Sequence, residues 1–363
     1  MYFFKKNPDA SETIRYVDFE LKVEIALCSK PECQHNSNTC NACFPYMGGS
    51  HNLVLSDDKL YVLFSAADEQ WIEKYGDSAI AHIEKMDLDG GNREYLCEIP
   101  NMLPNSGFDG YVFDDKKIYI MCNTAKKQGD GVTVEPNLLS IDQNSGQIEV
   151  EASNDSLSGI KNPRIFGTNK DNIILCGFSE GGLSDFNLFA YNLSNKSLTE
   201  LMSWNNSDSY GVFYQEELIL FSRHSGEVST YEILTGKLKN IWKTNEYEDI
   251  KSIGIRYIID RNFFGYITAQ NGTMKHFSLN LDTGEIIDFG ISILNAEELD
   301  YAEIRSQHQN YYIVTYMQED RVIEFPELNG KSTKLLIRDY NLAYILKSDF
   351  EKKQPNFIPV EQY

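Results

Sequence analysis

The feature that most constrains the fold of this chain is a short polar hairpin that recurs along it. Five segments place a polar turn between two apolar stretches, and they read MDLDGGNREYL, SIDQNSGQIEV, YNLSNKSLTEL, YEILTGKLKNI and LNLDTGEIIDF. Successive turn residues are 56, 49, 41 and 48 positions apart, and they are Gly90, Gly146, Asn195, Gly236 and Gly284. Repeats of about 40–50 residues with four short strands each are typical of β-propeller blades.

Between these turns, apolar and polar residues alternate and β-branched and aromatic residues are frequent, which predicts strands throughout. We therefore expect an all-β propeller of four-stranded antiparallel blades. The count is seven if the short first unit is a blade, and six if that unit is shared with the last one; we favour seven. Two insertions, at residues 124–136 and 318–341, are expected to form loops, and the termini to meet within one sheet.

The expected domain organisation is a single propeller over residues 1–363. Helix is scarce, and the best candidate is DEQWIEKYG at residues 68–76, which has an acidic first turn and a closing glycine. No stretch approaches 18 consecutive apolar residues, so we expect no membrane-spanning segment. The net charge of −21 would repel phosphate backbones, so nucleic acid is not an expected partner.

A cysteine- and histidine-rich segment at residues 28–43 stands apart from the repeats. It reads C-x4-C-x-H-x4-C-x2-C and lies between the strands expected for the first and second blades. Four thiols and an imidazole within sixteen residues could surround one tetrahedral Zn²⁺, and protein ligands alone would make that site structural. The preferred ligands are Cys28, Cys33, His35 and Cys40, with Cys43 as the alternative fourth ligand.

Two other interpretations of this segment remain open. In an oxidising compartment the four cysteines would form two disulfides, and His35 would be a surface residue. All four thiols could also be free. The three remaining cysteines, Cys97, Cys122 and Cys176, lie within or beside apolar strand patterns and are expected to be buried as small hydrophobic residues.

The chain contains no G-x-S-x-G, H-E-x-x-H, P-loop or dinucleotide-binding fingerprint. Aspartates at the hairpins are explained by turn chemistry more simply than by calcium binding. The other histidines are scattered over the repeats, at His51, His82, His224, His276 and His308. Three tryptophans in loops or at strand ends could stack on a ligand or pack between blades: Trp71, Trp204 and Trp242.

At the cysteine-rich segment the chain resembles a family of uncharacterised propeller proteins of Gram-positive gut anaerobes, many of them predicted lipoproteins. The matching residues are Leu27-Cys28, Cys33-Gln-His35, Cys40 and Phe44, together with the C-terminal YILKSDF and PNFIP segments. The hairpin MDLDGGNREYL is also similar to the repeat of YWTD propellers of the low-density-lipoprotein-receptor type. The resemblance implies display outside the cytoplasm and brings no known activity. The first residues, MYFFKKNPDASE, lack the features of a signal peptide, so a cytoplasmic location stays open.

We therefore expect a monomeric, non-catalytic binding propeller outside the cytoplasm, with loops that meet a protein, peptide or glycan. One alternative is a glycan-active enzyme with a site in the central channel. Another is a structural module of a surface assembly.

Overall fold

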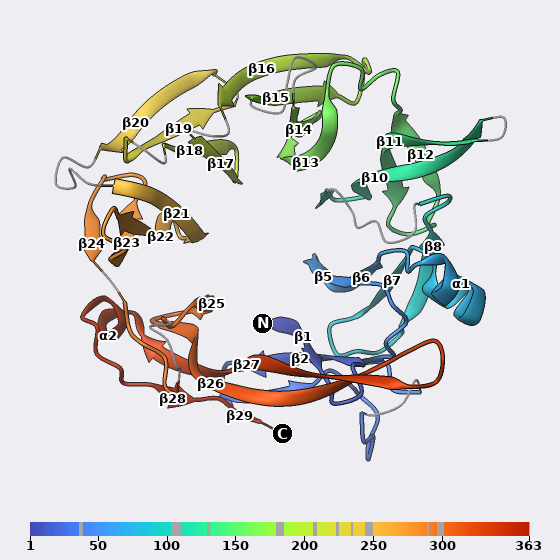
Figure 1. The fold of residues 1–363 in the computed structure, drawn as a ribbon, viewed down its shortest axis with the longest axis horizontal. Coiled ribbons are helices and arrows are strands. Elements are labelled where there is room, and N and C mark those ends of the chain that lie inside the picture. The colour runs from blue at the N-terminus through green and yellow to red at the C-terminus, as the bar shows by residue number, and fades with distance from the viewer. Residues whose placement is uncertain are drawn as a thin grey trace.

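The computed structural model describes residues 1–35, 39–102, 110–128, 131–178, 185–205, 209–222, 225–233, 235–243, 250–288, 290–295 and 301–362. Within these residues, seven antiparallel sheets stand around a common centre (Figure 1). The first strand of each sheet lies nearest the centre and the last lies at the rim. The prediction of a seven-bladed propeller is therefore confirmed.

The strands follow one another from the centre outward in each blade. Blade 1 contains β1 (Tyr2–Lys6), β2 (Glu12–Asp18), β3 (Val23–Ala26) and β4 (Cys43–Phe44); blade 2 contains β5 (His51–Ser56), β6 (Lys59–Phe64), β7 (His82–Asp87) and β8 (Glu94–Glu98). Blade 3 contains β9 (Tyr111–Phe113), β10 (Lys117–Gln128), β11 (Gly131–Asp142) and β12 (Ile148–Ala152); blade 4 contains β13 (Lys161–Asn169), β14 (Asn172–Phe178), β15 (Asp185–Asn192) and β16 (Leu198–Asn205).

The second half of the ring repeats this order. Blade 5 contains β17 (Ser209–Tyr214), β18 (Glu217–Ser222), β19 (Glu227–Glu232) and β20 (Lys237–Lys243); blade 6 contains β21 (Ile250–Ile259), β22 (Asn262–Ala269), β23 (Met274–Asn280) and β24 (Ile286–Asp288). Blade 7 contains β25 (Ile304–His308), β26 (Tyr311–Pro326), β27 (Ser332–Leu346) and β28 (Ile358–Pro359). The final strand, β29 (Glu361–Gln362), belongs to blade 1.

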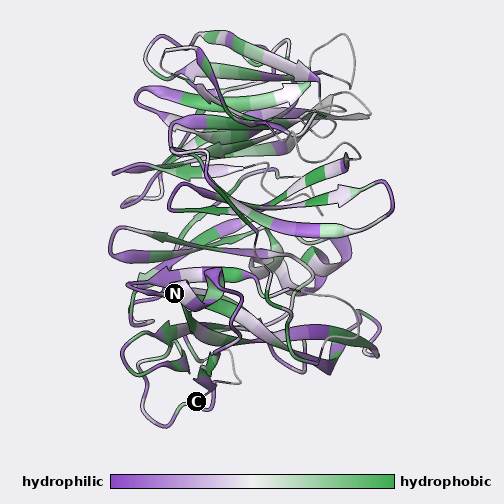
Figure 2. Cartoon of the chain, turned by 90° about the vertical axis from the view of Figure 1, so that its left-hand side faces the viewer, coloured by the Kyte–Doolittle hydropathy of each residue, from purple (hydrophilic) through white to green (hydrophobic). Residues whose placement is uncertain are grey.

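The apolar core lies between neighbouring blades. One cluster joins Leu63 and Ile83 of blade 2 with Ile118 and Ile141 of blade 3, all four fully buried. Seen from the side, hydrophobic residues follow the strands, whereas the turns are mostly hydrophilic (Figure 2). The alternation in the sequence thus supplies each blade with two faces that pack on its neighbours.

The recurring hairpin turns are stabilised by their own side chains and packed against the preceding blade. Asp142 Oδ1 accepts hydrogen bonds from the backbone N–H groups of Asn144 and Ser145 at 3.0 and 2.7 Å, which is the turn chemistry expected for these aspartates. Gly90 has a φ of +78°, and a Cβ placed on it would lie 2.3 Å from the carbonyl oxygen of Leu27 in blade 1. Glycine is therefore required there both for the backbone conformation and for the close approach.

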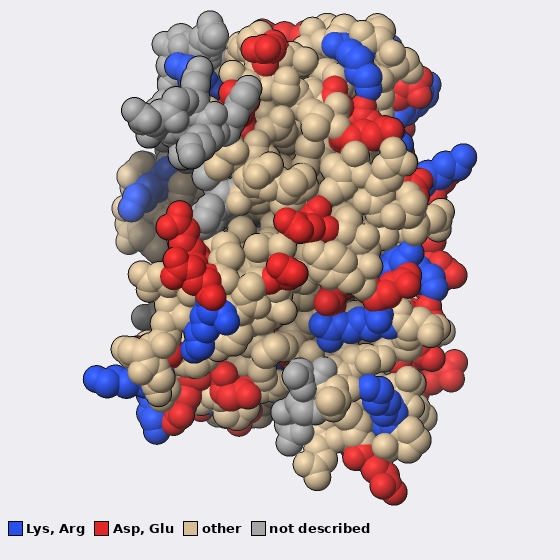
Figure 3. Space-filling view, turned by 90° about the vertical axis from the view of Figure 1, so that its right-hand side faces the viewer, with Lys and Arg blue, Asp and Glu red and all other residues tan. Residues whose placement is uncertain are grey.

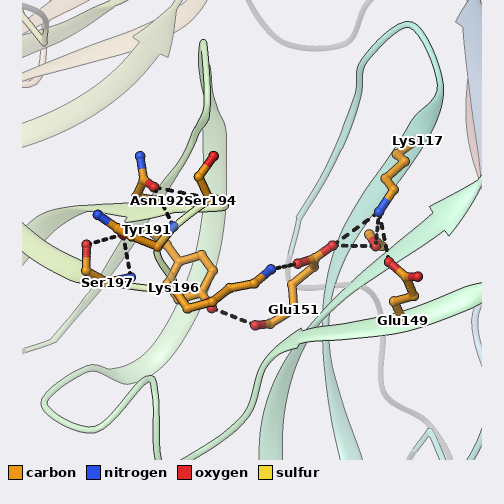
Figure 4. Close-up of polar contacts among 10 residues, drawn as sticks. Lys117, Glu149, Glu151, Tyr191, Asn192, Ser194, Lys196 and Ser197 are labelled. Atoms are coloured by element: carbon orange, nitrogen blue, oxygen red, sulfur yellow. Dashed lines mark hydrogen bonds and ion pairs between the residues drawn. The ribbon is translucent and has the colours of Figure 1, made fainter.

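Polar contacts also join neighbouring blades, and Glu151 of blade 3 is the clearest case (Figure 4). Its carboxylate forms an ion pair with Lys196 from the hairpin of blade 4 and accepts a hydrogen bond from Ser140 at 2.7 Å. Its backbone carbonyl accepts a hydrogen bond of 2.6 Å from the hydroxyl of Tyr191 in blade 4. One residue at the rim thus holds two blades together.

The ring closes where the end of the chain joins the first blade. Strand β29 pairs in parallel with β3, with Glu361 opposite Val23 and Gln362 opposite Glu24. The expected union of the two termini in one sheet is therefore confirmed. The third strand of blade 1 is itself split, because β3 and β4 pair with different parts of β2.

The two insertions expected to be loops are extended strand pairs instead, so that prediction is wrong. Strands β26 and β27 stay paired from Tyr311 opposite Leu346 to Pro326 opposite Ser332. We call residues 318–341 the ribbon; it reaches across blade 1 towards α1 (Figure 1). Strands β10 and β11 similarly continue through residues 124–136, of which 129–130 lie outside the described residues.

Helix is scarce, as expected. The predicted helix at residues 68–76 is confirmed as α1 (Glu69–Tyr75), with Asp68 as its N-cap and Gly76 as its C-cap, followed by the 3-10 turn η1 (Gly76–Ala79). Strand β27 ends at Leu346, and the residues that follow form the short helix α2 (Lys347–Glu351). Among the helices of the described residues, none has the length and apolar character needed to cross a membrane.

Candidate metal centre

The cysteine- and histidine-rich segment leaves and re-enters the same edge of blade 1. Ile14 in β2 forms backbone hydrogen bonds with both ends of it: its N–H donates to Ala42 O at 2.8 Å, and its carbonyl accepts from Leu27 N at 2.9 Å. The loop between Leu27 and Ala42 therefore begins and ends at the same edge of β2, and its two ends are held side by side. Residues 36–38 of this loop lie outside the described residues.

The structure brings together four of the five predicted ligand residues. One potential ligand atom each from Cys28, Cys33, His35 and Cys40 lies within 4.8 Å of all the others. His35 Nδ1 is 3.5 Å from Cys40 Sγ. The three cysteines, Cys28, Cys33 and Cys40, are free of disulfide bonds. These residues form a cluster that could bind a metal such as zinc.

The backbone around the cluster favours a thiolate at Cys33. His35 has a φ of +54°, and its backbone N–H donates a hydrogen bond to the Cys33 sulfur. This hydrogen bond lowers the pKa of the Cys33 thiol. At Cys40, burial has the opposite effect and raises the pKa of the thiol to about 12. For His35, burial followed by the charge of Arg15 lowers the pKa, which favours the neutral imidazole.

The donor set fits a tetrahedral zinc ion. Three thiols and a neutral imidazole are a common set for structural zinc, and ligand sulfurs about 2.3 Å from the metal would lie roughly 3.8 Å apart. The observed separations of up to 4.8 Å need only a small contraction to reach that geometry. A bound zinc ion would also deprotonate the coordinating thiols, Cys40 included.

Cys43, the alternative ligand, lies outside this group of four. It begins β4, is 3% exposed, and packs in the apolar cluster around Phe44 and Phe64. Its thiol has a raised pKa because it is buried, although a hydrogen bond from Ser11 opposes that effect. The other three cysteines, Cys97, Cys122 and Cys176, are buried in strands as predicted.

The end of the loop is attached to blade 2 through Arg93. The Nη1 atom of Arg93 donates hydrogen bonds of 3.1 Å to the carbonyl oxygens of Asn41 and Cys43. Its guanidinium lies 3.8 Å above the centre of the Phe44 ring, and its Nε atom is 2.6 Å from Glu84 Oε2. The segment that follows the cluster is therefore fixed to the second blade by hydrogen bonds and by a cation–π contact, and the ion pair with Glu84 holds Arg93 in place within that blade.

A cavity of about 1000 Å³ lies beside this attachment, between blades 1 and 2. We call it the groove. One wall is the segment at residues 43–47 that follows the metal ligands, and the other is formed by β6, α1, η1, β7 and β8. No motif in the sequence indicated it, because its lining is drawn from five separate segments.

The groove combines stacked rings with carboxylates. Tyr95 stacks on His82 with ring centres 5.2 Å apart, and His82 stacks on Phe64 at 4.0 Å. His82 Nδ1 is 2.8 Å from the carbonyl oxygen of Ile80, and burial lowers its pKa. Partial burial, followed by the charge of Glu98 and other nearby acidic groups, raises the pKa of the Tyr95 hydroxyl to about 12. Tyr95 nevertheless remains 52% exposed.

The tryptophans pack against other rings of the fold. Trp71 is buried in α1 and stacks on Tyr75 at 5.5 Å. Trp204 stacks on Phe186, and Trp242 on Phe277, each at 5.7 Å. Of the histidines, His51 and His82 both contact Phe64, whereas His276 and His308 lie in other blades and His224 lies outside the described residues.

Comparisons with known proteins identify the fold but no family. No protein-family model matches the chain, and a search of curated proteins finds no relative. Among solved structures, the chain is similar to a Mycobacterium tuberculosis puromycin-hydrolyzing peptidase (TM-score 0.55, 10% identity, 99% of this chain and 51% of that chain). It is also similar to an oligogalacturonate lyase in complex with manganese (TM-score 0.54, 11% identity, 93% and 84%).

A more distant similarity links it to a chain of a nidogen/laminin complex (TM-score 0.39, 11% identity, 79% and 91%). The chain spans about half the length of the peptidase that it matches. At these identities the similarities to the peptidase and the lyase show a propeller and do not select an activity.

Proposed function

We propose that this chain is a non-catalytic binding propeller that works outside the cytoplasm and uses a structural zinc ion to hold its groove in shape. Cys28, Cys33, His35 and Cys40 are the proposed ligands. The observation that carries the proposal is the convergence of these four side chains, within 4.8 Å of one another, immediately before the wall of the groove.

The zinc ion would act through the loop that it closes. Most of residues 29–35 and Thr39 are exposed and polar, so they bury little apolar surface that could order them. Metal coordination would supply that order. The ordered loop would present Asn41 and Cys43 to Arg93 of blade 2, and so fix the wall at residues 43–47.

The groove is the proposed binding surface, and a protein, peptide or glycan is the proposed ligand. Its volume of about 1000 Å³ is at the upper end of the usual range for ligand sites. The exposed rings of Tyr75 and Tyr95 offer flat apolar surfaces beside hydrogen-bonding carboxylates. Rings of this kind serve both sugar stacking and peptide contact.

The metal is tested by zinc content and free-thiol count on protein purified without chelator. We expect one zinc per chain, lost in His35→Ala and Cys40→Ser and retained in Cys176→Ala, which removes a thiol far from the loop. If the protein contains no metal and four of its thiols are blocked, the loop holds two disulfides and no zinc, and that result would support export. If the protein contains no metal and all seven thiols are free, both the zinc and the disulfide interpretations of the loop are overturned.

Binding is tested separately by probing glycan and peptide arrays with the wild-type protein and with Tyr95→Ala. Tyr210→Ala, which removes an exposed tyrosine from blade 5, is the matched control. Signals that disappear only in Tyr95→Ala would support the groove. Signals unchanged by Tyr95→Ala would place binding elsewhere.

A further inference from the structure

The seven innermost strands have a charge composition opposite to that of the whole chain. The sequence holds 54 acidic and 33 basic residues. Strands β1, β5, β9, β13, β17, β21 and β25 nevertheless contain no aspartate or glutamate, and their basic residues are Lys5, Lys6, Lys161, Arg164, Lys251, Arg256 and Arg305.

The rim shows the reverse pattern. In blades 2, 3, 4 and 6 the outermost strands carry acidic residues and no basic ones: Glu94, Glu98, Glu149, Glu151, Glu200 and Asp288. Blade 5 is the exception, because its outermost strand carries Lys237, Lys239 and Lys243 and no acidic residue. Acidic and basic side chains mix over the side of the ring that carries α1 and β12 (Figure 3). The innermost strands therefore carry net positive charge within an acidic molecule, and that charge would attract anions.

Five basic residues of blades 6, 7 and 1 line two cavities that share Arg305. One cavity, of about 460 Å³, is lined by four basic residues against two acidic ones: Lys5, Lys6, Arg305 and Arg321 against Glu24 and Asp339. The other, of about 620 Å³, is lined by Arg256 and Arg305 together with Glu303. The first cavity lies in the range of volumes that hold small ligands.

Two of the carboxylates near these cavities are each shared between two cations, so each neutralises its cations only in part. Glu303 forms ion pairs with both Arg256 and Arg305, the second at 3.0 Å. Glu24 is likewise shared by Lys5 at 3.0 Å and Arg15 at 2.6 Å. Each of these two clusters keeps an excess of positive charge.

The guanidinium of Arg321, in the first cavity, also has one N–H group without a hydrogen-bond acceptor among the described residues. Arg321 Nη2 is 2.8 Å from Asp339 Oδ2. Its Nε–H is buried and has no hydrogen-bond partner among the described residues. A buried donor without a partner is costly, and an anion in the cavity would satisfy it.

From this arrangement we propose that the first cavity, between blades 7 and 1, binds a small anion that bears carboxylate or phosphate groups. Arg305 and Arg321 would bind its oxygens through their planar guanidinium groups, which suit both chemistries. Lys5 and Lys6 would add charge from the opposite wall. This site is separate from the groove and does not depend on the zinc centre.

The test is calorimetric titration of the whole chain with citrate and, separately, with inorganic phosphate at about 20 mM NaCl, where charge interactions are weakly screened. We expect saturable binding of at least one anion, weakened at higher salt. Arg305→Gln and Lys6→Gln should each weaken it about tenfold or more. Whichever anion binds more tightly identifies the carboxylate or the phosphate as the preferred group.

Arg338→Gln is the matched control, because it removes the same charge from the ribbon. Ile337 and Asp339 line the cavity, so strand alternation places Arg338 on the other face. We expect its affinity to stay within about twofold of wild type, since it makes no contact with the cavity. No saturable binding of either anion, or equal weakening by Arg338→Gln and Arg305→Gln, would overturn the proposal; circular dichroism verifies that each variant is folded.

Discussion

The ring of Phe325 meets that of Tyr46 edge to face, with the ring centres 5.5 Å apart and the planes at 83°. Phe325 lies near the tip of the ribbon from blade 7, and Tyr46 follows β4 of blade 1. Glu324 N also donates a hydrogen bond of 2.7 Å to Pro8 O, and Leu328 packs against the buried cluster that contains Trp71 of α1. The ribbon thus connects blade 7 to blade 2 across blade 1.

We expect Phe325→Ala to lower the free energy of unfolding by about 2 kcal/mol, because a half-buried ring loses its contact with Tyr46. Urea denaturation followed by fluorescence measures the change. Leu336→Ala, on the same ribbon but 70% exposed, should change stability by less than about 0.5 kcal/mol. Equal effects of the two substitutions would show that the ribbon tip does not stabilise the ring.

Removal of the proposed zinc should loosen the junction between blades 1 and 2. After chelation we expect amide hydrogen exchange at residues 39–43 to accelerate about tenfold or more, since the loop loses what orders it. Strands β17–β20 of blade 5 serve as the internal control and should not change. Uniform acceleration over the whole chain would contradict a local role for the metal.

Gly90→Ala should destabilise the protein more than Gly272→Ala does. Both glycines have a positive φ, +78° and +84°, so each substitution costs about 1–2 kcal/mol of backbone strain. A Cβ at position 272 meets open space, whereas one at position 90 would lie 2.3 Å from Leu27 O. We expect thermal melts to show an additional loss of about 1–3 kcal/mol for Gly90→Ala. Equal losses would mean that blade 1 moves aside freely.

The ion pair between Glu151 and Lys196 should make stability depend on pH. Burial raises the pKa of Glu151, but hydrogen bonds from Lys196 and Ser140 outweigh this effect, and its pKa lies below the usual 4.5. The stabilisation is therefore fully present above the unfolded-state pKa and is lost as the pH falls through the lower folded-state pKa. We expect Glu151→Gln to cost about 1–2 kcal/mol at pH 7 and progressively less below about pH 4.

Glu227→Gln provides the comparison for that experiment. Its partner, Lys243, is 60% exposed, and the pair lies within blade 5, so its loss should cost less than about 0.5 kcal/mol at either pH. Denaturant midpoints at pH 7 and at about pH 3 measure both variants. A Glu151→Gln effect that stays constant with pH would refute the assigned ionisation.

Much of the fold could be predicted because its signals lie within short stretches of the sequence. The polar turns recur at blade spacing, and the helix at α1 carries its own caps in Asp68 and Gly76. The cluster of Cys28, Cys33, His35 and Cys40 was also accessible, because its ligands are close in sequence. Local signals of this kind do not require knowledge of which blades are neighbours.

Features that depend on the closed ring could not be predicted in this way. The ribbon resembles an insertion in sequence, since its partner surfaces at Pro8 and Tyr46 are about 300 positions away. The groove and the cavity lined by Lys5, Arg305 and Arg321 likewise combine residues from separate blades. Which side chains line them becomes known only once the order of the strands and blades is known.

The ribbon changes how the molecule can come apart. Two residue pairs join β29 to β3, so a protease or a pulling force that peeled away the last strand would act on a short seam. The contacts of the ribbon with blades 1 and 2 do not involve β29. Release of the C-terminal strand alone would therefore leave the ring closed, and opening it would require the ribbon contacts to break as well.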